Sequence, residues 1–151
     1  MLQFISQLSP NQTVGGVHCV PILENGNVVM VWDRKEKVLT TIGGRMNPNE
    51  TIMECLDREV REEAGIELTD ERILFASWYW KQFDAYRLFY LVKVKRFIER
   101  PEGFETTGYV IANFETAIEM IRRIEGRKER IEVIRRAGIL AGQLKAPESG
   151  K

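Results

Sequence analysis

The stretch from Gly44 to Ile66 constrains this chain more than any other part of it. It reads GRMNPNETIMECLDREVREEAGI, so a glycine and a turn-forming Asn-Pro-Asn come first and a helix-like run follows. Thr51 followed by Glu54 is a capping-box pattern, which predicts a helix that begins just after Thr51. Gly65 is placed to end that helix in the left-handed conformation. The stretch therefore predicts a loop, one helix and a sharp stop.

The predicted helix carries two kinds of charge. Successive helical residues lie about 100° apart, which gives one apolar side and one charged side. Glu59, Glu62 and Glu63 converge at the edge of the apolar side, and like charges this close destabilise a helix. A hard divalent cation such as Mg²⁺ would stabilise them through oxygen ligands. The alternative is a solvated acidic face held by i,i+4 ion pairs. Those pairs would be Glu54–Arg58 and Asp57–Arg61.

Strands flank this helix, and further helices follow them. The predicted strands cover 14–23, 28–32, 38–42, 73–80, 86–94 and 108–112, and the later helices cover 114–124, capped by Asn113, and 128–144. This order indicates an α/β fold in which a mixed sheet is flanked by helices on both sides. At 151 residues the chain is expected to be one domain, residues 1–151, with a helical C-terminal part at about 113–145.

Composition argues against several classes of partner. The 22 basic residues balance 22 acidic ones, so no nucleic-acid polymer or membrane surface is expected as a partner. No apolar run approaches the length of a membrane span. The two cysteines, Cys19 and Cys55, have neither disulfide-scaffold nor metal spacing, which suits a reducing compartment. We therefore expect a cytoplasmic protein.

The central stretch resembles the signature of the Nudix hydrolases, G-x5-E-x7-R-E-u-x-E-E-x-G-u, in which u is aliphatic. The matching residues are Gly44, Glu50, Arg58, Glu59, Val60, Glu62, Glu63, Gly65 and Ile66. Two neighbouring positions depart from the family's habit, because Ile42 replaces a common proline and Asn49 replaces a common glycine. Asparagine tolerates the left-handed region, so the turn at Asn49 is expected to persist. The resemblance implies a Nudix-type α/β/α sandwich.

The resemblance also implies roles for these residues. Glu59, Glu62 and Glu63 would be metal ligands, with Gly44 offering its backbone carbonyl, and the cofactor would be Mg²⁺ or Mn²⁺. Glu50 would pair with Arg58 to fix the loop against the helix, which competes with the Glu54–Arg58 pairing. Gly65 would be structural. Cys55 stands where the family has a small residue, and we interpret it as filler.

The implied reaction is attack of water on a phosphorus of a nucleoside diphosphate linked to another group. A carboxylate takes the proton from that water. The resemblance implies two alternative places for this base, and within the helix it would be Glu62 or Glu63. On a later loop it is Glu105, with Glu102 as the second choice, and an ordinary exposed acid is an equal explanation for Glu105.

Several residues are candidates for holding the substrate. Arg34 and Arg45 are placed to contact phosphates, while Trp78 and Trp80 are aromatic surfaces for a base, although core packing explains at least one of them better. Marks of specialised subfamilies are missing, so a nucleoside triphosphate is the default substrate. ADP-ribose, a sugar nucleotide, a dinucleoside polyphosphate and a non-hydrolytic nucleotide-sensing module are the alternatives. The last helix packs on the sheet or forms a homodimer contact.

Overall fold

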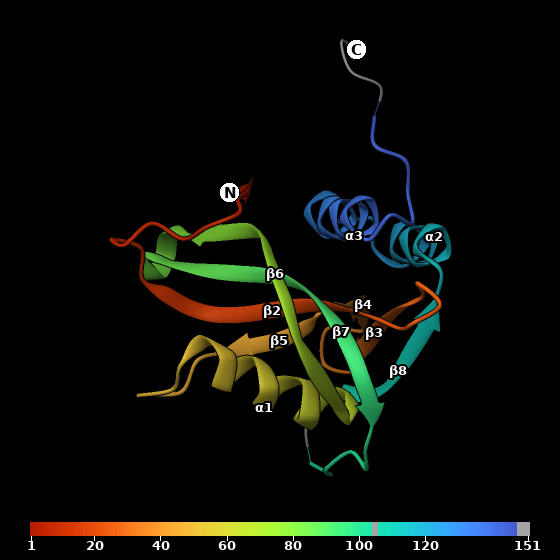
Figure 1. Ribbon diagram of the computed structural model, residues 1–151, viewed down its shortest axis with the longest axis horizontal. Coiled ribbons are helices and arrows are strands. Elements are labelled where there is room, and N and C mark those ends of the chain that lie inside the picture. The colour runs from red at the N-terminus through yellow and green to blue at the C-terminus, as the bar shows by residue number, and fades with distance from the viewer. Residues whose placement is uncertain (104–105, 148–151) are drawn as a thin grey trace.

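The computed structural model describes residues 1–103 and 106–147 of the chain (Figure 1). The strands are β1 (Leu2–Phe4), β2 (Val14–Ile22), β3 (Val28–Asp33), β4 (Val38–Thr40), β5 (Ile42–Arg45), β6 (Ile66–Trp80), β7 (Ala85–Phe97) and β8 (Thr106–Ala112). The helices are α1 (Ile52–Ala64), α2 (Phe114–Ile124) and α3 (Lys128–Leu140), with a 3₁₀ turn at Lys81–Phe83.

The strands form one mixed sheet. Its order is β1-β6-β7-β2-β3-β4, with β5 paired to β2 and β8 paired to β3. The β2–β7 pair is parallel, whereas the other pairs are antiparallel. This arrangement confirms the mixed sheet predicted from the sequence. It also brings β5, which ends at the start of the central loop, beside β2 in the middle of the sheet.

The two faces of the sheet carry separate cores. In β3, Val28 and Met30 join the core beneath α2 and α3, while Val29 and Val31 join the core beneath α1. Successive side chains of a strand point to opposite faces, so one apolar strand serves both cores. Figure 1 shows α1 on one side of the sheet and the pair α2 and α3 on the other. The fold is therefore the expected α/β/α sandwich.

Local signals set the ends of α1. The Thr51 side chain accepts from the N–H of Glu54, and the Glu54 side chain accepts from the N–H of Thr51, so the predicted capping box is confirmed. Gly65 follows the helix in the left-handed region with φ 65°. Asn49 also lies there, with φ 64°, which confirms that asparagine preserves the turn. These short-range features hold α1 at a fixed position against β5.

Some boundaries differ from the prediction. The segment Leu2–Phe4 forms β1 by pairing with Ala76–Trp78 of β6, and three residues are too few to show a strand periodicity. Strands β6 and β7 are longer than predicted because each supports the other along most of its length. Helix α3 ends at Leu140, and its buried side chains pack into the core on the sheet. In the described part of the chain, no helix is long and apolar enough to cross a membrane.

Candidate active site

At the centre of the candidate site, the Glu59 side chain contacts Gly44. Gly44 pairs with Val17 of β2, which fixes the end of β5 beside α1. A Cβ atom at Gly44 would lie 2.5 Å from Glu59 Oε1, so glycine leaves the space that this carboxylate fills. Glu59 is only 8% exposed, and this burial raises its pKa against the opposing effect of the Arg58 guanidinium. A buried carboxylate is thus held against the loop that precedes α1.

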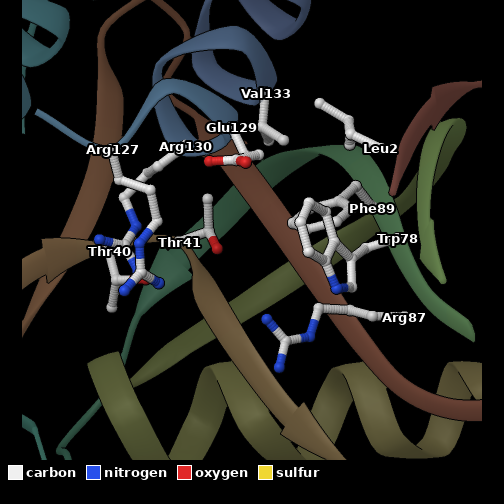
Figure 2. Close-up of a pocket in the computed structure, with 10 residues that line it drawn as sticks. All are labelled: Leu2, Thr40, Thr41, Trp78, Arg87, Phe89, Arg127, Glu129, Arg130 and Val133. Carbon is white, nitrogen blue, oxygen red and sulfur yellow. The ribbon is translucent and has the colours of Figure 1, made fainter. Parts of the chain in front are cut away.

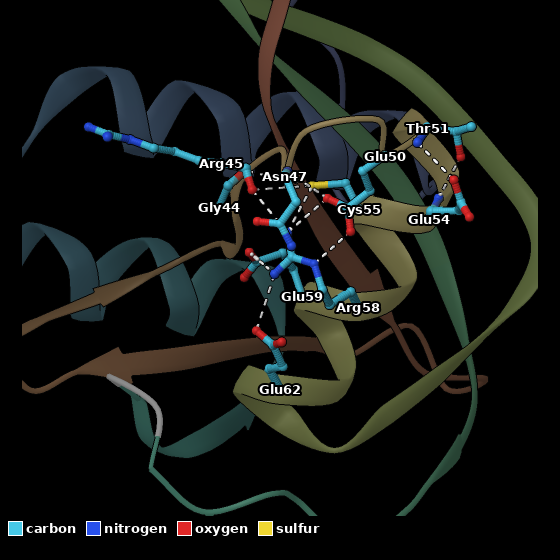
Figure 3. Close-up of polar contacts among 10 residues, drawn as sticks. All are labelled: Gly44, Arg45, Asn47, Glu50, Thr51, Glu54, Cys55, Arg58, Glu59 and Glu62. Atoms are coloured by element: carbon cyan, nitrogen blue, oxygen red, sulfur yellow. Dashed lines mark hydrogen bonds and ion pairs between the residues drawn. The ribbon is translucent and has the colours of Figure 1, made fainter.

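Arg58 fastens that loop to the helix (Figure 3). Its Nε and Nη2 donate to Glu50 Oε2 and Oε1 at 2.7 and 2.9 Å, and Nη2 also donates to the carbonyl oxygen of Arg45 at 3.0 Å. Bidentate arginine–carboxylate pairs of this kind are among the stronger polar contacts. The Arg58 hydrogen bonds lower the pKa of Glu50 to about 2. Of the two carboxylates considered for Arg58, the structure therefore selects Glu50.

The remaining carboxylates already have donors. Arg58 Nη1 contacts Glu59 Oε1 at 2.9 Å and Glu62 Oε2 at 3.3 Å. With Glu50, the Arg58 guanidinium therefore contacts three carboxylates. Glu63 Oε2 accepts from the backbone N–H of Gly43 at 3.0 Å. Within residues 1–103 and 106–147, no three Asp, Glu, His or Cys side chains are already gathered around one ion position.

The donor chemistry nevertheless fits a divalent cation. Three carboxylates, those of Glu59, Glu62 and Glu63, lie in the last two turns of α1. Glu59 and Glu63 contact the loop at Gly44 and Gly43, and Glu62 is joined to Glu59 through Arg58. Carboxylate and carbonyl oxygens are the ligands that hard cations prefer. Arg58 Nη1 supplies the positive charge between Glu59 and Glu62, and a cation bound there would take over that position.

Cys55 lies beneath this network as a neutral thiol. It is fully buried, and burial raises its pKa to about 12. A thiol becomes nucleophilic as its thiolate, which such a pKa disfavours. This position agrees with the interpretation of Cys55 as small filler.

A second region of interest is a cavity of about 220 Å³ on the opposite face of the sheet, bordered by the start of α3 (Figure 2). Trp78 and Phe89 line one side of it. Arg87, Arg127 and Arg130 also line it, and in the view of Figure 2 the last two lie across from the aromatic pair.

Trp80 lies close to one arginine of each region. The guanidinium carbon of Arg45 is 5.8 Å from the centroid of Trp80, and that of Arg87 is 4.5 Å from it. Trp80 also meets Phe83 edge-on at 5.3 Å. Trp78 instead packs partly into the core beneath α2 and α3, as expected for at least one tryptophan.

The structure does not gather every candidate. Arg34 lies in the exposed turn between β3 and β4 and is not among the residues lining the cavity. Glu102 is exposed in the loop after β7. Glu105 lies outside the described residues, so its role stays a prediction. Two cavity residues that the sequence did not single out, Arg127 and Arg130, are three positions apart at the start of α3, a spacing that indicates a shared helix face.

We expect Glu50→Gln to lower the free energy of unfolding by about 2 kcal/mol at pH 7, because it weakens a partly buried, bidentate pair with Arg58. Chemical denaturation of both proteins measures this difference. Glu71→Gln is the matched control, since Glu71 and its partner Lys93 are both more than half exposed. We expect the control to change the unfolding free energy by less than about 0.5 kcal/mol.

The loss caused by Glu50→Gln is also expected to depend on pH. A carboxyl group with a lowered folded pKa stabilises the fold above its unfolded pKa, and this contribution disappears as pH falls through the folded value. For Glu50 the window runs from its ordinary value of 4.5 down to about 2. The difference between wild type and variant should therefore shrink across that window. A difference that stays constant would contradict the strong Glu50–Arg58 interaction.

Comparison with known proteins agrees with this geometry. The family model described as the NUDIX domain matches residues 13–137. A NUDIX-family hydrolase from Clostridium perfringens superposes with a TM-score of 0.65 at 18% identity, covering 86% of this chain and 98% of that one. An Ap4A hydrolase from C. elegans gives 0.62 at 16% identity, with coverages of 84% and 98%.

A third similar structure is that of a mutant of the Bacillus subtilis pyrophosphohydrolase BsRppH. It gives a TM-score of 0.62 at 18% identity and covers 74% of this chain and 70% of that one. At such identities the structures show a shared fold. A search of curated proteins finds no significant sequence match.

Proposed function

The chain belongs to the NUDIX family and is a pyrophosphohydrolase, and from that premise we propose that it hydrolyses a nucleoside triphosphate with the help of Mg²⁺ or Mn²⁺. Members of the family generally use divalent metal ions and act on nucleotides. The observation that carries the proposal is the buried Glu59 carboxylate, packed against Gly44 and bridged to Glu62 by Arg58.

In this proposal the acidic residues of α1 and of the loop before it have different roles. Glu59, Glu62 and Glu63 would hold the metal ion together with the Gly44 carbonyl, while Glu50 would keep Arg58 and the loop in place. The metal ion, when bound, neutralises the diphosphate and makes the attacking water more acidic. Glu62 or Glu63 takes the proton, with Glu105 as the candidate from the later loop.

The substrate would extend from α1 towards the cavity. Arg45 directly follows Gly44 and is exposed, so its guanidinium is available to a phosphate oxygen. Trp78 lines the cavity and offers an aromatic surface to the nucleoside. The similar structures include a pyrophosphohydrolase and an Ap4A hydrolase, which supports a phosphoanhydride as the bond that breaks.

A panel of nucleotides tests this proposal. Purified protein is incubated with nucleoside triphosphates, ADP-ribose, sugar nucleotides and dinucleoside polyphosphates, with Mg²⁺ or with a chelator. We expect pyrophosphate release from a triphosphate that stops in the chelator, because the carboxylates alone leave the diphosphate charge uncompensated.

The products decide between the alternatives. Turnover of only ADP-ribose, a sugar nucleotide or a dinucleoside polyphosphate would keep the family and replace the substrate. A nucleotide-dependent rise in melting temperature without turnover over hours would instead indicate a sensing module. Equal turnover with and without the chelator would contradict the role of the metal.

A further inference from the structure

Arg87 is a half-buried cation that forms no ion pair within the described part of the chain. Its guanidinium stacks on Trp80, and within residues 1–103 and 106–147 no carboxylate lies at ion-pairing distance from it. Burial is the largest cause that lowers its pKa, followed by repulsion from Arg130, and Arg127 and Arg45 add to that repulsion. Glu36 opposes the effect from a distance. An anion bound in the cavity would offset the positive charge of Arg87 and of the arginines near it.

The other arginines of the cavity come from the first turn of α3 and the residue before it. Glu125 pairs with both: Arg130 Nη1 contacts its Oε1, and Arg127 Nε lies 3.8 Å from its Oε2. Arg130 is nearly buried, whereas the Arg127 side chain is 56% exposed and its ion pair with Glu125 is long. Arg127 is therefore free to turn towards a ligand, and Arg130 adds fixed positive charge behind it.

The cavity contains one acid among its described lining residues. Glu129 lies on the wall formed by α3, and its carboxylate is drawn between the arginines and the aromatic pair in Figure 2. A carboxylate accepts hydrogen bonds from hydroxyl groups but repels anions. A ligand with both an anionic group and a hydroxyl, such as a phosphorylated sugar, suits this combination.

The size of the cavity limits what enters it. Sites that enclose a whole small molecule measure about 300–1,000 Å³. At about 220 Å³ this cavity takes only one end of a nucleotide. Trp80 connects it to the acidic site, because its ring contacts both Arg87 of the cavity and Arg45, the residue after Gly44. One substrate can therefore present its diphosphate to α1 and its other end to Arg87.

We propose that the preferred substrate carries a second phosphate, on its ribose, and that Arg87 and Arg127 bind this phosphate. The inference rests on the proposed hydrolysis at α1 and specifies the class of nucleotide. Arginine forms paired, charge-assisted hydrogen bonds with phosphate oxygens, and its planar group can do so while it stacks on an aromatic ring. Trp78 and Phe89 then pack against the nucleoside.

Calorimetric titration without metal tests the phosphate site separately from catalysis. The probes are adenosine 5′-monophosphate, adenosine 3′,5′-bisphosphate and adenosine 2′,5′-bisphosphate, with the guanosine series in parallel. We expect one of the bisphosphates to bind at least about tenfold more tightly than the monophosphate of its own series. Comparison within a series removes the contribution of the base. Equal affinities throughout, or a preference set only by the base, would overturn the inference.

Four variants test whether the residues of the cavity cause the preference for the bisphosphate. Arg87→Gln and Arg127→Gln should each reduce the preference for the bisphosphate to less than about threefold, because each removes a phosphate contact. Glu129→Gln should increase that preference, since it removes a negative charge from the cavity. Arg123→Gln, at an exposed arginine of α2 paired with Glu119, should leave it unchanged. Loss of the preference in Arg123→Gln to the same extent as in Arg87→Gln would show a general charge effect and refute the site.

Hydrolysis assays separate the two proposals. Wild type should turn over a nucleoside triphosphate with a ribose phosphate at a higher kcat/KM than the plain triphosphate, and Arg87→Gln should bring the ratio close to one. Turnover without any effect of the ribose phosphate would refute this inference and leave the proposed function intact. A bisphosphate preference in binding without any turnover would refute the proposed function alone.

Discussion

Glu63→Gln is expected to lower the rate of nucleotide hydrolysis by about 10²- to 10⁴-fold while the protein stays folded. Glu63 lies in the last turn of α1, and its Oε2 accepts the N–H of Gly43, so its carboxylate lies at the loop that carries the Gly44 carbonyl. A glutamine amide oxygen can still accept that N–H, but the amide carries no charge and takes no proton. The substitution therefore removes both proposed roles of Glu63, as metal ligand and as base, with little change in shape.

The matched control for this variant is Glu54→Gln, on the same helix. Glu54 closes the capping box with Thr51, and glutamine serves at this position as glutamate does. We expect wild-type kcat and melting temperature from the control. Initial rates with saturating Mg²⁺, measured beside circular dichroism melts, compare the two variants. Wild-type turnover in Glu63→Gln would remove Glu63 from the site, and equal losses in both variants would indicate a general effect of helix charge.

The features predicted correctly from the sequence depend on short-range interactions. The capping box of Thr51 and Glu54 needs residues three apart, and the turns at Asn49 and Gly65 depend on what one backbone can adopt. The apolar runs predicted the central strands, because most residues of a buried strand are apolar whichever face they serve. These local patterns predict the folded structure correctly because no contact with a distant segment overrides them.

The ion pairs of α1 show where local reasoning fails. Spacing along the helix predicted Glu54–Arg58, but Glu54 already accepts the N–H of Thr51 and Arg58 turns to Glu50 instead. Asp57 pairs with Arg72 of β6 at 2.7 Å, a partner fifteen residues away. A tertiary partner held by a packed strand has already lost its conformational freedom, so it forms a pair more readily than two flexible helical side chains do.

The cavity could not be predicted from the sequence for the same reason. Arg87 lies near the start of β7, whereas Arg127 and Arg130 belong to the start of α3, and only the packing of α3 on the sheet brings them together. Each arginine alone is typical of an ordinary surface charge. The absence of an acidic partner for Arg87 within the described residues is a property of the folded protein.

Alanine substitutions at the neighbouring Gly43 and Gly44 are expected to have different effects. The first should mainly destabilise the fold, and the second should mainly impair catalysis. A Cβ atom at Gly43 would overlap the carbonyl oxygen of Val17 and lie 2.5 Å from the Cα of His18, and both belong to the backbone of β2. Backbone in the centre of a sheet cannot move aside without breaking its ladder. Gly43→Ala should therefore lower the free energy of unfolding by more than about 3 kcal/mol.

At Gly44 the added Cβ atom would meet the carboxylate of Glu59, which is the end of a flexible side chain. Gly44→Ala should therefore cost less than about 1 kcal/mol of stability, because Glu59 can turn away and Gly44 has no left-handed φ to maintain. That movement displaces a proposed metal ligand, so kcat should fall by more than about tenfold.

Denaturant melts and initial rates on the same preparations separate the two effects of the glycine substitutions. Raising the Mg²⁺ or Mn²⁺ concentration should restore part of the activity of Gly44→Ala, since a displaced Glu59 weakens metal binding without removing a carboxylate. Lowering the assay temperature should instead restore part of the activity of Gly43→Ala, because that variant loses activity through unfolding. A Gly44→Ala enzyme with wild-type kcat and metal dependence would show that the contact between Gly44 and Glu59 belongs to packing alone.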